Sequence, residues 1–312
     1  MNATGTTVTA FAPASVGNVG VGFDALGHAL DFAGDRVRLT VTEEPDIRLD
    51  AITGLTTDLP SDTTSNTALR ALTAIQQECG VSAGARLTLE KGIPLGSGMG
   101  GSAASAAAAV TAAAEAWGLA LSDHERLRFA LEGEMAASGA LHADNVAPSL
   151  FGGLVLCEGE GYPHVTRIPV PTDVVCVFVH PDLEVYTRSA RNMLSAQVSL
   201  SDHVSQTQAI AGFVAGCFRS DLDQIGRCLK DVIVEPQRAG LVPGFRRVQA
   251  AAMANGALGA SLSGSGPSIF AWCETGRAAG IQACMAEAFH VEGVSCSAWV
   301  SAVNAAGARL ED

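Results

Sequence analysis

Residues 94–104 read PLGSGMGGSAA, a glycine-rich stretch that runs directly into an alanine-rich segment. Glycine allows the backbone to adopt left-handed conformations and lets N–H groups approach a ligand closely. A helix that starts immediately afterwards points the positive end of its dipole at the same place. The stretch is not a Walker A loop, because it contains no lysine and does not end in Gly-Lys-Ser or Gly-Lys-Thr. The sequence therefore predicts an anion-binding turn of another kind, suited to a polyphosphate.

The composition limits the class of partner. With 312 residues, of which 48% are hydrophobic and 16% charged, the chain is long enough for two domains with full cores. A net charge of −13 argues against binding a nucleic acid or an anionic membrane, because either needs a broad basic surface. Lysine occurs only at positions 91 and 230. Positive potential around a phosphate would therefore come from backbone amides, a metal ion and a few arginines.

The eight cysteines contain no C-x-x-C pair, which is typical of reduced core residues in a cytosolic protein. The first residues lack a basic segment followed by an apolar core, and the long apolar run at 103–117 is interrupted by Ser105, Thr111 and Glu115. We therefore expect a cytoplasmic protein with neither a signal peptide nor a membrane span.

Hydrophobic periodicity predicts alternating strands and helices in the first half of the chain. Strands are expected over 7–11, 36–43, 86–90 and 153–157, and helices over 67–79, from 101 and from 122. Ser122 and Glu125 have the spacing of a capping box. The helix from 102 to 117 has almost no polar face, so we expect it to be buried on most sides. Glycine and proline at 158–173 predict a linker.

The second half predicts an α+β domain with one antiparallel sheet. Strands are expected over 174–179, 260–262, 268–272 and 295–300, and helices over 201–219, 222–232, 245–255 and 277–289. The predicted division is a first domain at 1–165 and a second domain at 166–312.

Three segments together resemble the GHMP kinase superfamily over nearly the whole chain. They are APASVGNVGVGFDALGHAL at 12–30, the glycine-rich stretch at 94–104, and GASLSGSGPS at 259–268. Three further segments are similar to the homoserine kinase branch, namely HADNVAPSLFGG at 142–153, TRSAR at 187–191 and EPQRAGLVPGF at 235–245. The resemblance implies an N-terminal domain like ribosomal protein S5 domain 2, a ferredoxin-like C-terminal domain and a homodimer.

The resemblance also implies an activity. It is the Mg²⁺-dependent transfer of the ATP γ-phosphate to the hydroxyl of L-homoserine, which gives O-phospho-L-homoserine on the way to threonine. One departure is visible, because the family loop usually reads GLGSSAAS, whereas this chain has Met99 for the leucine and Gly101 for the first serine. Methionine conserves the volume of leucine, and Gly101 loses a hydroxyl but keeps its amide.

By this resemblance, the nucleotide is bound mainly by the glycine-rich loop. Its residues are Pro94, Gly96, Ser97, Gly98, Met99, Gly100, Gly101 and Ser102. Ser102 and Glu134 match the family's oxygen ligands for Mg²⁺. Glu132 is a natural control, because an unmatched helical glutamate is more often solvated. Asn66 and Lys91 are expected to contact the nucleotide, although an asparagine ahead of a helix is more often its cap.

The acceptor residues follow from the chemistry of an amino acid. Asp24 is expected to bind the ammonium group, and Arg191 and Arg238 the carboxylate. The remaining predicted site residues are Asn18 at the reacting hydroxyl, His142 and Asp144 near the acceptor, and Asn145 and Thr187 on the phosphate side. Asp144 is interpreted as a positioning carboxylate, because the resemblance implies a reaction that can run without a dedicated base. The loop at 263–268 is expected to support the phosphate loop.

Two alternatives stay open at this point. The first is another small-molecule GHMP kinase, for shikimate or mevalonate; shikimate has a carboxylate for the arginines, but mevalonate has no amine for Asp24. The second is a non-catalytic ligand sensor of the same fold, which the presence of Ser102 and Glu134 disfavours.

Overall fold

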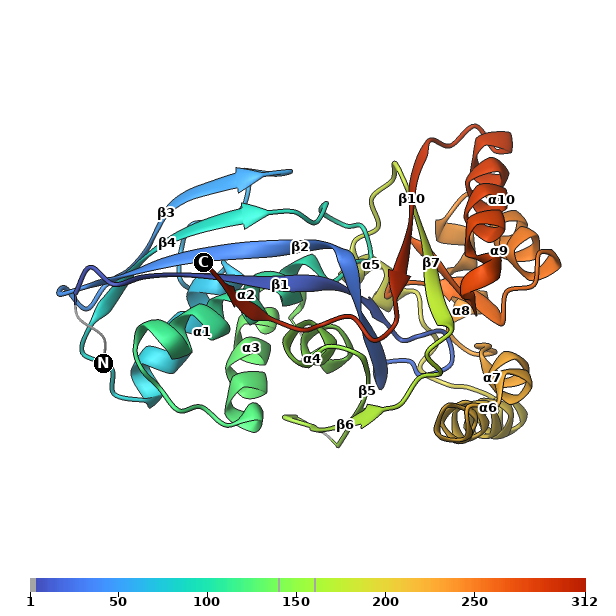
Figure 1. Cartoon of the computed structure of the whole chain (residues 1–312), viewed down its shortest axis with the longest axis horizontal. Helices are drawn as coiled ribbons and strands as arrows, with labels where there is room; N and C mark the ends of the chain where they lie inside the picture. Colours follow the sequence, from blue (N-terminus) through green and yellow to red (C-terminus); the bar gives the residue numbers. More distant parts are fainter. Residues whose placement is uncertain (1–3, 140, 160) are drawn as a thin grey trace.

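The computed structural model describes residues 4–139, 141–159 and 161–312 (Figure 1). These residues form two sheets, one of seven strands and one of four, each covered by helices. The seven-stranded sheet is built mainly from the first half of the chain and the four-stranded sheet from the second half. The α+β expectation is confirmed. Within the described ranges, no helix is both long and apolar enough to cross a membrane.

The first sheet has the strand order β11-β1-β2-β4-β3, and β5 joins it by pairing with β2 and β6. Its strands are β1 Thr7–Gly17, β2 Leu26–Thr42, β3 Ile47–Gly54, β4 Gly84–Lys91, β5 Leu154–Glu158, β6 His164–Ile168 and β11 Arg309–Glu311. Strands β3 and β4 are parallel and the other pairs are antiparallel. The long strand β2 pairs with β5 at its start and with β4 further along, so it spans the width of the domain.

Four helices lie together beneath this sheet in Figure 1. They are α1 Thr67–Glu78, α2 Gly101–Ala116, α3 Asp123–Ser138 and α4 Ala143–Phe151. Helix α2 contacts β1, β2 and the other three helices, and almost every residue from Ala103 to Ala116 is buried, as predicted. Small side chains permit this packing: a Cβ at Gly133 of α3 would lie 2.5 Å from the Thr67 carbonyl oxygen. The capping box of Ser122 and Glu125 is also confirmed.

The second sheet has the order β10-β7-β9-β8 and is antiparallel throughout. Its strands are β7 Val174–Pro181, β8 Gly259–Leu262, β9 Ile269–Glu274 and β10 Cys296–Ala302. The helices of this half are α5 Thr187–Asn192, α6 Leu200–Arg219, α7 Leu222–Cys228, α8 Glu235–Arg238, α9 Phe245–Ala254 and α10 Ala278–Val291. Helices α9 and α10 pack against the sheet.

Aromatic contacts join the two sheets. Phe32 of β2 stacks on Trp299 of β10 with ring centres 4.6 Å apart, and the Trp272 indole donates a hydrogen bond of 3.3 Å to Nε2 of His28. Complete burial lowers the pKa of His28 to about 4, so its ring is neutral. This histidine therefore stabilises the junction between the sheets as an uncharged core residue.

Three strands depart from the sequence predictions. The predicted linker at 158–173 contains β6, and both β3 and β11 were not expected. Strands β3 and β6 are largely exposed edge strands. Strand β6 has little apolar alternation, whereas β3 alternates at Ile47, Leu49 and Ala51, a signal that the prediction missed. Strand β11 pairs with β1, so the end of the chain returns to the first sheet, a feature that the division at residues 165 and 166 does not describe (Figure 1).

Candidate active site

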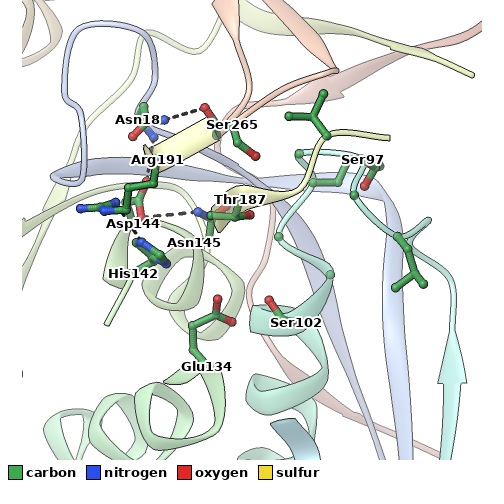
Figure 2. A pocket seen from close by; sticks show the side chains of 18 of the residues that line it. Asn18, Ser97, Ser102, Glu134, His142, Asp144, Asn145, Thr187, Arg191 and Ser265 are labelled. Carbon is green, nitrogen blue, oxygen red and sulfur yellow. Dashed lines mark hydrogen bonds between the residues drawn. The ribbon is translucent and has the colours of Figure 1, made fainter. Parts of the chain in front are cut away.

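A cavity of about 180 Å³ lies where the first sheet's helices meet the elements of the second half (Figure 2). It brings together most of the predicted site residues, which come from distant parts of the sequence. Those that line it are Asn18, Asp24, Pro94, Gly96, Ser97, Gly98, Met99, Gly100, Gly101, Ser102, Glu134, His142, Asp144, Asn145, Thr187, Arg191 and Arg238. Asn66 and Lys91 are not among the lining residues.

The glycine-rich loop is held by bonds to its carbonyl oxygens. The carbonyls of residues 96–99 accept hydrogen bonds from the Val185 amide (2.9 Å), the Ser268 hydroxyl (2.6 Å), the Ser263 hydroxyl (2.6 Å) and the Ser15 amide (3.0 Å), in that order. In a trans peptide bond, the N–H of the next residue points in the direction opposite to the carbonyl oxygen. The N–H groups of residues 97–100 therefore turn away from these supports, on a loop that lines the cavity.

Backbone conformation explains the glycines. Gly96, Gly98 and Gly100 have φ values of 59°, 74° and 67°, the left-handed region that favours glycine. A Cβ at Gly98 would lie 2.5 Å from the carbonyl oxygen of Ser263. The loop at 263–268 thus supports the phosphate loop, as predicted, through its hydroxyls and through this close backbone approach. No residue other than glycine satisfies both requirements at position 98.

Helix α2 begins immediately after the loop, with Gly100 as its N-cap. The first N–H groups of a helix have no acceptor inside the helix, so they are available to an anion. Ser102 lies in this first turn, and Figure 2 shows its side chain and the carboxylate of Glu134 facing the same space. Glu134 comes from α3 and is only 5% exposed.

The oxygen donors of Ser102 and Glu134 suit Mg²⁺. This ion commonly takes one or two protein oxygens and completes its shell with water and phosphate oxygens. Among the described residues, no group of three or more His, Cys, Asp or Glu side chains could hold a metal ion by itself. The donor set therefore fits a cation that arrives with a nucleotide better than a permanently bound one.

The opposite end of the cavity is shaped by the loop between β1 and β2. Asn18, Val19 and Asp24 have left-handed φ values of 67°, 44° and 57°. The Asn18 side chain accepts a hydrogen bond from the Asp24 amide (3.0 Å) and donates one to the Gly264 carbonyl (2.9 Å). Asn18 was predicted to touch the reacting hydroxyl. It lines the cavity, but its amide also braces a strained loop against the second half of the chain.

The residues predicted for the two ends of the acceptor contact one another. Arg191 donates to both carboxylate oxygens of Asp24, with Nη1–Oδ1 at 3.2 Å. Its Nη1 also lies 3.0 Å from Nε2 of His142. Burial lowers the pKa of His142, which favours a neutral ring that can accept this bond. Buried Arg238 donates to the carbonyls of Ala190 and Gly264, each at 3.3 Å.

Asp144 is deeply buried, at 2% exposure, in the first turn of α4. Its Oδ2 accepts the Asn18 amide at 2.9 Å, and its Oδ1 lies 3.4 Å from Nδ2 of Asn145. The Ser15 hydroxyl donates to Oδ1 of Asn145 at 3.0 Å, which fixes the orientation of that amide. Burial, and then the negative charge of Asp24, raise the pKa of Asp144 to about 7.

Lys91, which was predicted to contact the nucleotide, is not among the residues that line the cavity. Its ammonium is buried beneath the start of α2, where it contacts the carboxylate of Asp35, the Gly101 carbonyl (2.9 Å) and the Ser105 hydroxyl (2.9 Å). These three contacts support the start of the helix. A Cβ at Gly101 would lie 3.2 Å from Ile93, which explains why the smallest residue fits there.

Asn66, also predicted to contact the nucleotide, does not line the cavity either. Its side chain accepts hydrogen bonds from the amides of Ala68 (3.0 Å) and Leu69 (3.2 Å), so it caps α1. Its Nδ2 donates to the Pro60 carbonyl at 2.8 Å. Asn66 is therefore the N-cap of α1, and the side-chain amide that could contact a base is already hydrogen-bonded to the helix.

Five lining residues were not among the predicted site residues: Phe23, Leu95, Val185, Gly264 and Ser265. Phe23 stands beside Asp24 in a matched motif, and Ser265 lies in the serine-rich loop, so both had a positional signal. Val185 had none, because its contribution is a backbone N–H that any residue except proline supplies.

The comparisons with known proteins agree with this geometry. The family model for the GHMP kinases N terminal domain matches residues 66–153, and that for the GHMP kinases C terminal domain matches 213–291. A homoserine kinase of Xylella fastidiosa is 44% identical over 302 residues, which cover 96% of this chain and 93% of the relative. The chain belongs to the homoserine kinase family of the GHMP kinases.

Other members of the homoserine kinase family are similar over the same extent. The homoserine kinase of Chlorobium phaeobacteroides is 42% identical over 97% of this chain and 99% of its own length. The crystal structure of homoserine kinase from Cytophaga hutchinsonii superimposes with a TM-score of 0.95 at 41% identity, covering 100% of this chain and 99% of that one. The family comprises ATP-dependent phosphotransferases that act on a hydroxyl.

Proposed function

We propose that this protein transfers the γ-phosphoryl group of ATP to the hydroxyl of L-homoserine. The product is O-phospho-L-homoserine, a step towards threonine. One observation supports the proposal: the glycine-rich loop at the start of α2 and a pair of opposite charges, Asp24 and Arg191, line the same cavity. A zwitterionic alcohol bound by the charged pair would have its hydroxyl close to a phosphate bound by the loop.

The acceptor end matches an α-amino acid. The ammonium group would replace Arg191 at the carboxylate of Asp24, and the carboxylate would take the guanidinium that Asp24 releases. Arg238 supplies a second guanidinium close by. Charge-assisted bonds of this kind are strong and directional, particularly where arginine can bind both carboxylate oxygens. An acceptor without an amine, such as mevalonate, would leave Asp24 unpaired beside the buried Asp144.

The loop end supplies the electrostatic stabilisation that phosphoryl transfer requires. Negative charge spreads over the oxygens of the transferring group in the transition state. The N–H groups of residues 97–100 and the first turn of α2 would bind these oxygens without rearrangement. Ser102 and Glu134 would hold Mg²⁺, which neutralises phosphate charge when it is bound.

The nucleoside is proposed to lie on the outer side of the loop. A second cavity of about 370 Å³ there shares Pro94 and Leu95 with the first. Its other lining residues are Leu55, Thr56, His180, Asp182, Leu183 and Glu184. Apolar side chains suit a base, and the carboxylates suit ribose hydroxyls. This location replaces the predicted contacts with Asn66 and Lys91.

Product identification tests the proposal. The protein is incubated with ATP, Mg²⁺ and L-homoserine, and the products are identified by ³¹P NMR and mass spectrometry. We expect O-phospho-L-homoserine and ADP in equal amounts, no product when Mg²⁺ is chelated, and no phosphorylation of shikimate or mevalonate. Binding of homoserine without any product would instead identify a ligand sensor. The proposed homodimer is tested separately by sedimentation velocity.

A further inference from the structure

Phe23 lies between the two arginines of the acceptor end. Its half-buried side chain lines the cavity, and the guanidinium carbons of Arg191 and Arg238 lie 5.4 and 5.2 Å from the centre of its ring. A guanidinium within about 6 Å of an aromatic centre is attracted by the negative face of the ring. One ring from the β1–β2 loop therefore contacts cations from α5 and α8 at once.

The ring is needed because these two cations repel each other. Arg191 is neutralised by Asp24, but Arg238 forms no ion pair within the described part of the chain. Burial lowers the pKa of Arg238, which shows that its charge is poorly solvated here. Two backbone carbonyls and the face of Phe23 contact it, and the nearby carboxylates of Asp24, Asp144 and Asp231 also favour its charge. When Asp24 turns to a substrate ammonium, the ring also remains in contact with Arg191.

We propose that Phe23 is a positioning residue that holds both guanidiniums in place for the carboxylate of the acceptor. The inference rests on the proposed function, since it names what sets affinity and specificity at that site. Without the ring, each arginine would lose one of the contacts that hold it, so the substrate would have to supply more of its ordering, and that ordering costs conformational entropy. Acceptors without a carboxylate would gain nothing from Phe23.

The chain offers a matched control in Phe11. Its ring also has two guanidinium carbons over it, those of Arg36 at 5.2 Å and Arg309 at 4.3 Å. This cluster lies on β1, β2 and β11, and none of its members lines the cavity. Arg36 is also held by Glu311 at 2.7 Å. A Phe11 variant therefore measures how much stability is lost when an aromatic ring that contacts two guanidiniums is removed at a position away from the site.

The test compares Phe23→Leu with Phe23→Tyr and Phe11→Leu, using steady-state kinetics for both substrates and thermal melting. Phe23→Leu should raise KM for homoserine about tenfold, with kcat and KM for ATP within about twofold of the unsubstituted protein. Phe23→Tyr, which keeps the ring, should restore KM. Phe11→Leu should lower the melting temperature and leave both KM values unchanged. Phe23→Met repeats the test if the leucine variant does not fold.

L-Homoserine carboxamide separates positioning from a general loss of structure, because it has the amine and hydroxyl but no carboxylate. The effect of Phe23→Leu on kcat/KM should be at least about fivefold smaller for this amide than for homoserine. An equal effect on both acceptors, an equal rise in KM for ATP, or an unchanged KM for homoserine would overturn the inference alone. Absence of product with the unsubstituted protein would overturn the proposed function and this inference with it.

Discussion

The two ends of the cavity differ in construction, because a glycine-rich main-chain loop lines one end and charged side chains line the other. The loop at 96–100 is fixed from behind by hydrogen bonds to four consecutive carbonyls. At the other end, Arg191 bonds to both Asp24 and His142. Under the proposed function, the loop would bind an anion without rearrangement, whereas Arg191 and Asp24 would have to exchange partners before an acceptor binds.

This difference separates two properties of the enzyme. Affinity for a triphosphate depends on backbone geometry, so it changes when the loop can no longer adopt its conformation. Choice of acceptor depends on a few side chains whose charges match the two ends of an amino acid. Substitutions at the two ends should therefore affect different kinetic constants.

Gly98→Ala should have the largest effect, because the added Cβ would meet the Ser263 carbonyl at 2.5 Å and the residue has a φ of +74°. We expect kcat/KM for ATP to fall about 10³-fold, as the loop N–H groups leave their positions. Gly80→Ala is the control, since Gly80 has a φ of +64° but nothing within 4 Å of its Cβ position. A comparable loss of activity in both variants would mean that backbone strain alone, not loop geometry, is responsible.

Glu134→Gln should reduce kcat about 100-fold and raise the Mg²⁺ concentration needed for half-maximal activity. The matched control is Glu132→Gln on the same helix, where the carboxylate contacts Arg70 and Tyr162 instead of the cavity. The control should keep its Mg²⁺ dependence. If both variants have the same dependence, Glu134 does not hold the metal.

Arg191→Ala should act on the acceptor end alone. Removing a guanidinium that binds a carboxylate should raise KM for homoserine about 30-fold. The KM for ATP should change little, because the loop is supported by other residues. A collapse of ATP affinity in this variant would show that the two ends are not independent and that the carboxylate pocket is wrongly placed.

Of these substitutions, Asp144→Asn should have the smallest effect on activity at neutral pH. The pKa of this carboxyl is raised from its ordinary value of 3.8 to about 7, so the folded protein binds the proton more tightly than the unfolded chain does. The free energy of unfolding should therefore fall as pH rises from 3.8 to about 7, and level off above that. Denaturant titrations at several pH values across this range should show that the free energy of unfolding changes less steeply with pH in the Asp144→Asn variant.

The Asp144 carboxyl should also affect how activity depends on pH. If the ionised carboxylate positions Asn18, kcat/KM should rise about twofold between pH 7 and pH 8 as ionisation is completed. The Asp144→Asn profile should lack this rise. A profile that keeps its inflection would assign it to another group.

Local sequence signals predicted much of the fold. The capping box at Ser122 and the buried alanine helix α2 were predicted because both depend on residues within a few positions of each other. Edge strand β6 escaped prediction because solvent covers much of it and its residues hardly alternate, whereas β3 was missed although Ile47, Leu49 and Ala51 alternate with polar residues. Strand β11 escaped because its partner, β1, lies at the other end of the chain.

The predicted site residues also divide into those that local sequence indicates and those whose position depends on the fold. The glycine-rich loop was readable because its function requires particular backbone conformations, and those conformations require glycine. Lys91 was assigned to the nucleotide because it precedes the loop in sequence. The fold instead buries it against Asp35, whose position on β2 nothing near residue 91 reveals.

By itself, the sequence predicted an anion site where a glycine turn meets a helix, and it predicted that charged residues in matched motifs contact an amino acid. Only the tertiary structure decided that Asp24 and Arg191 pair, that Phe23 contacts both arginines, and that Lys91 supports a helix. The backbone conformation of a residue is determined mainly by neighbours within a few positions in the sequence. The partner of a charge is set by which distant segments packing brings within reach.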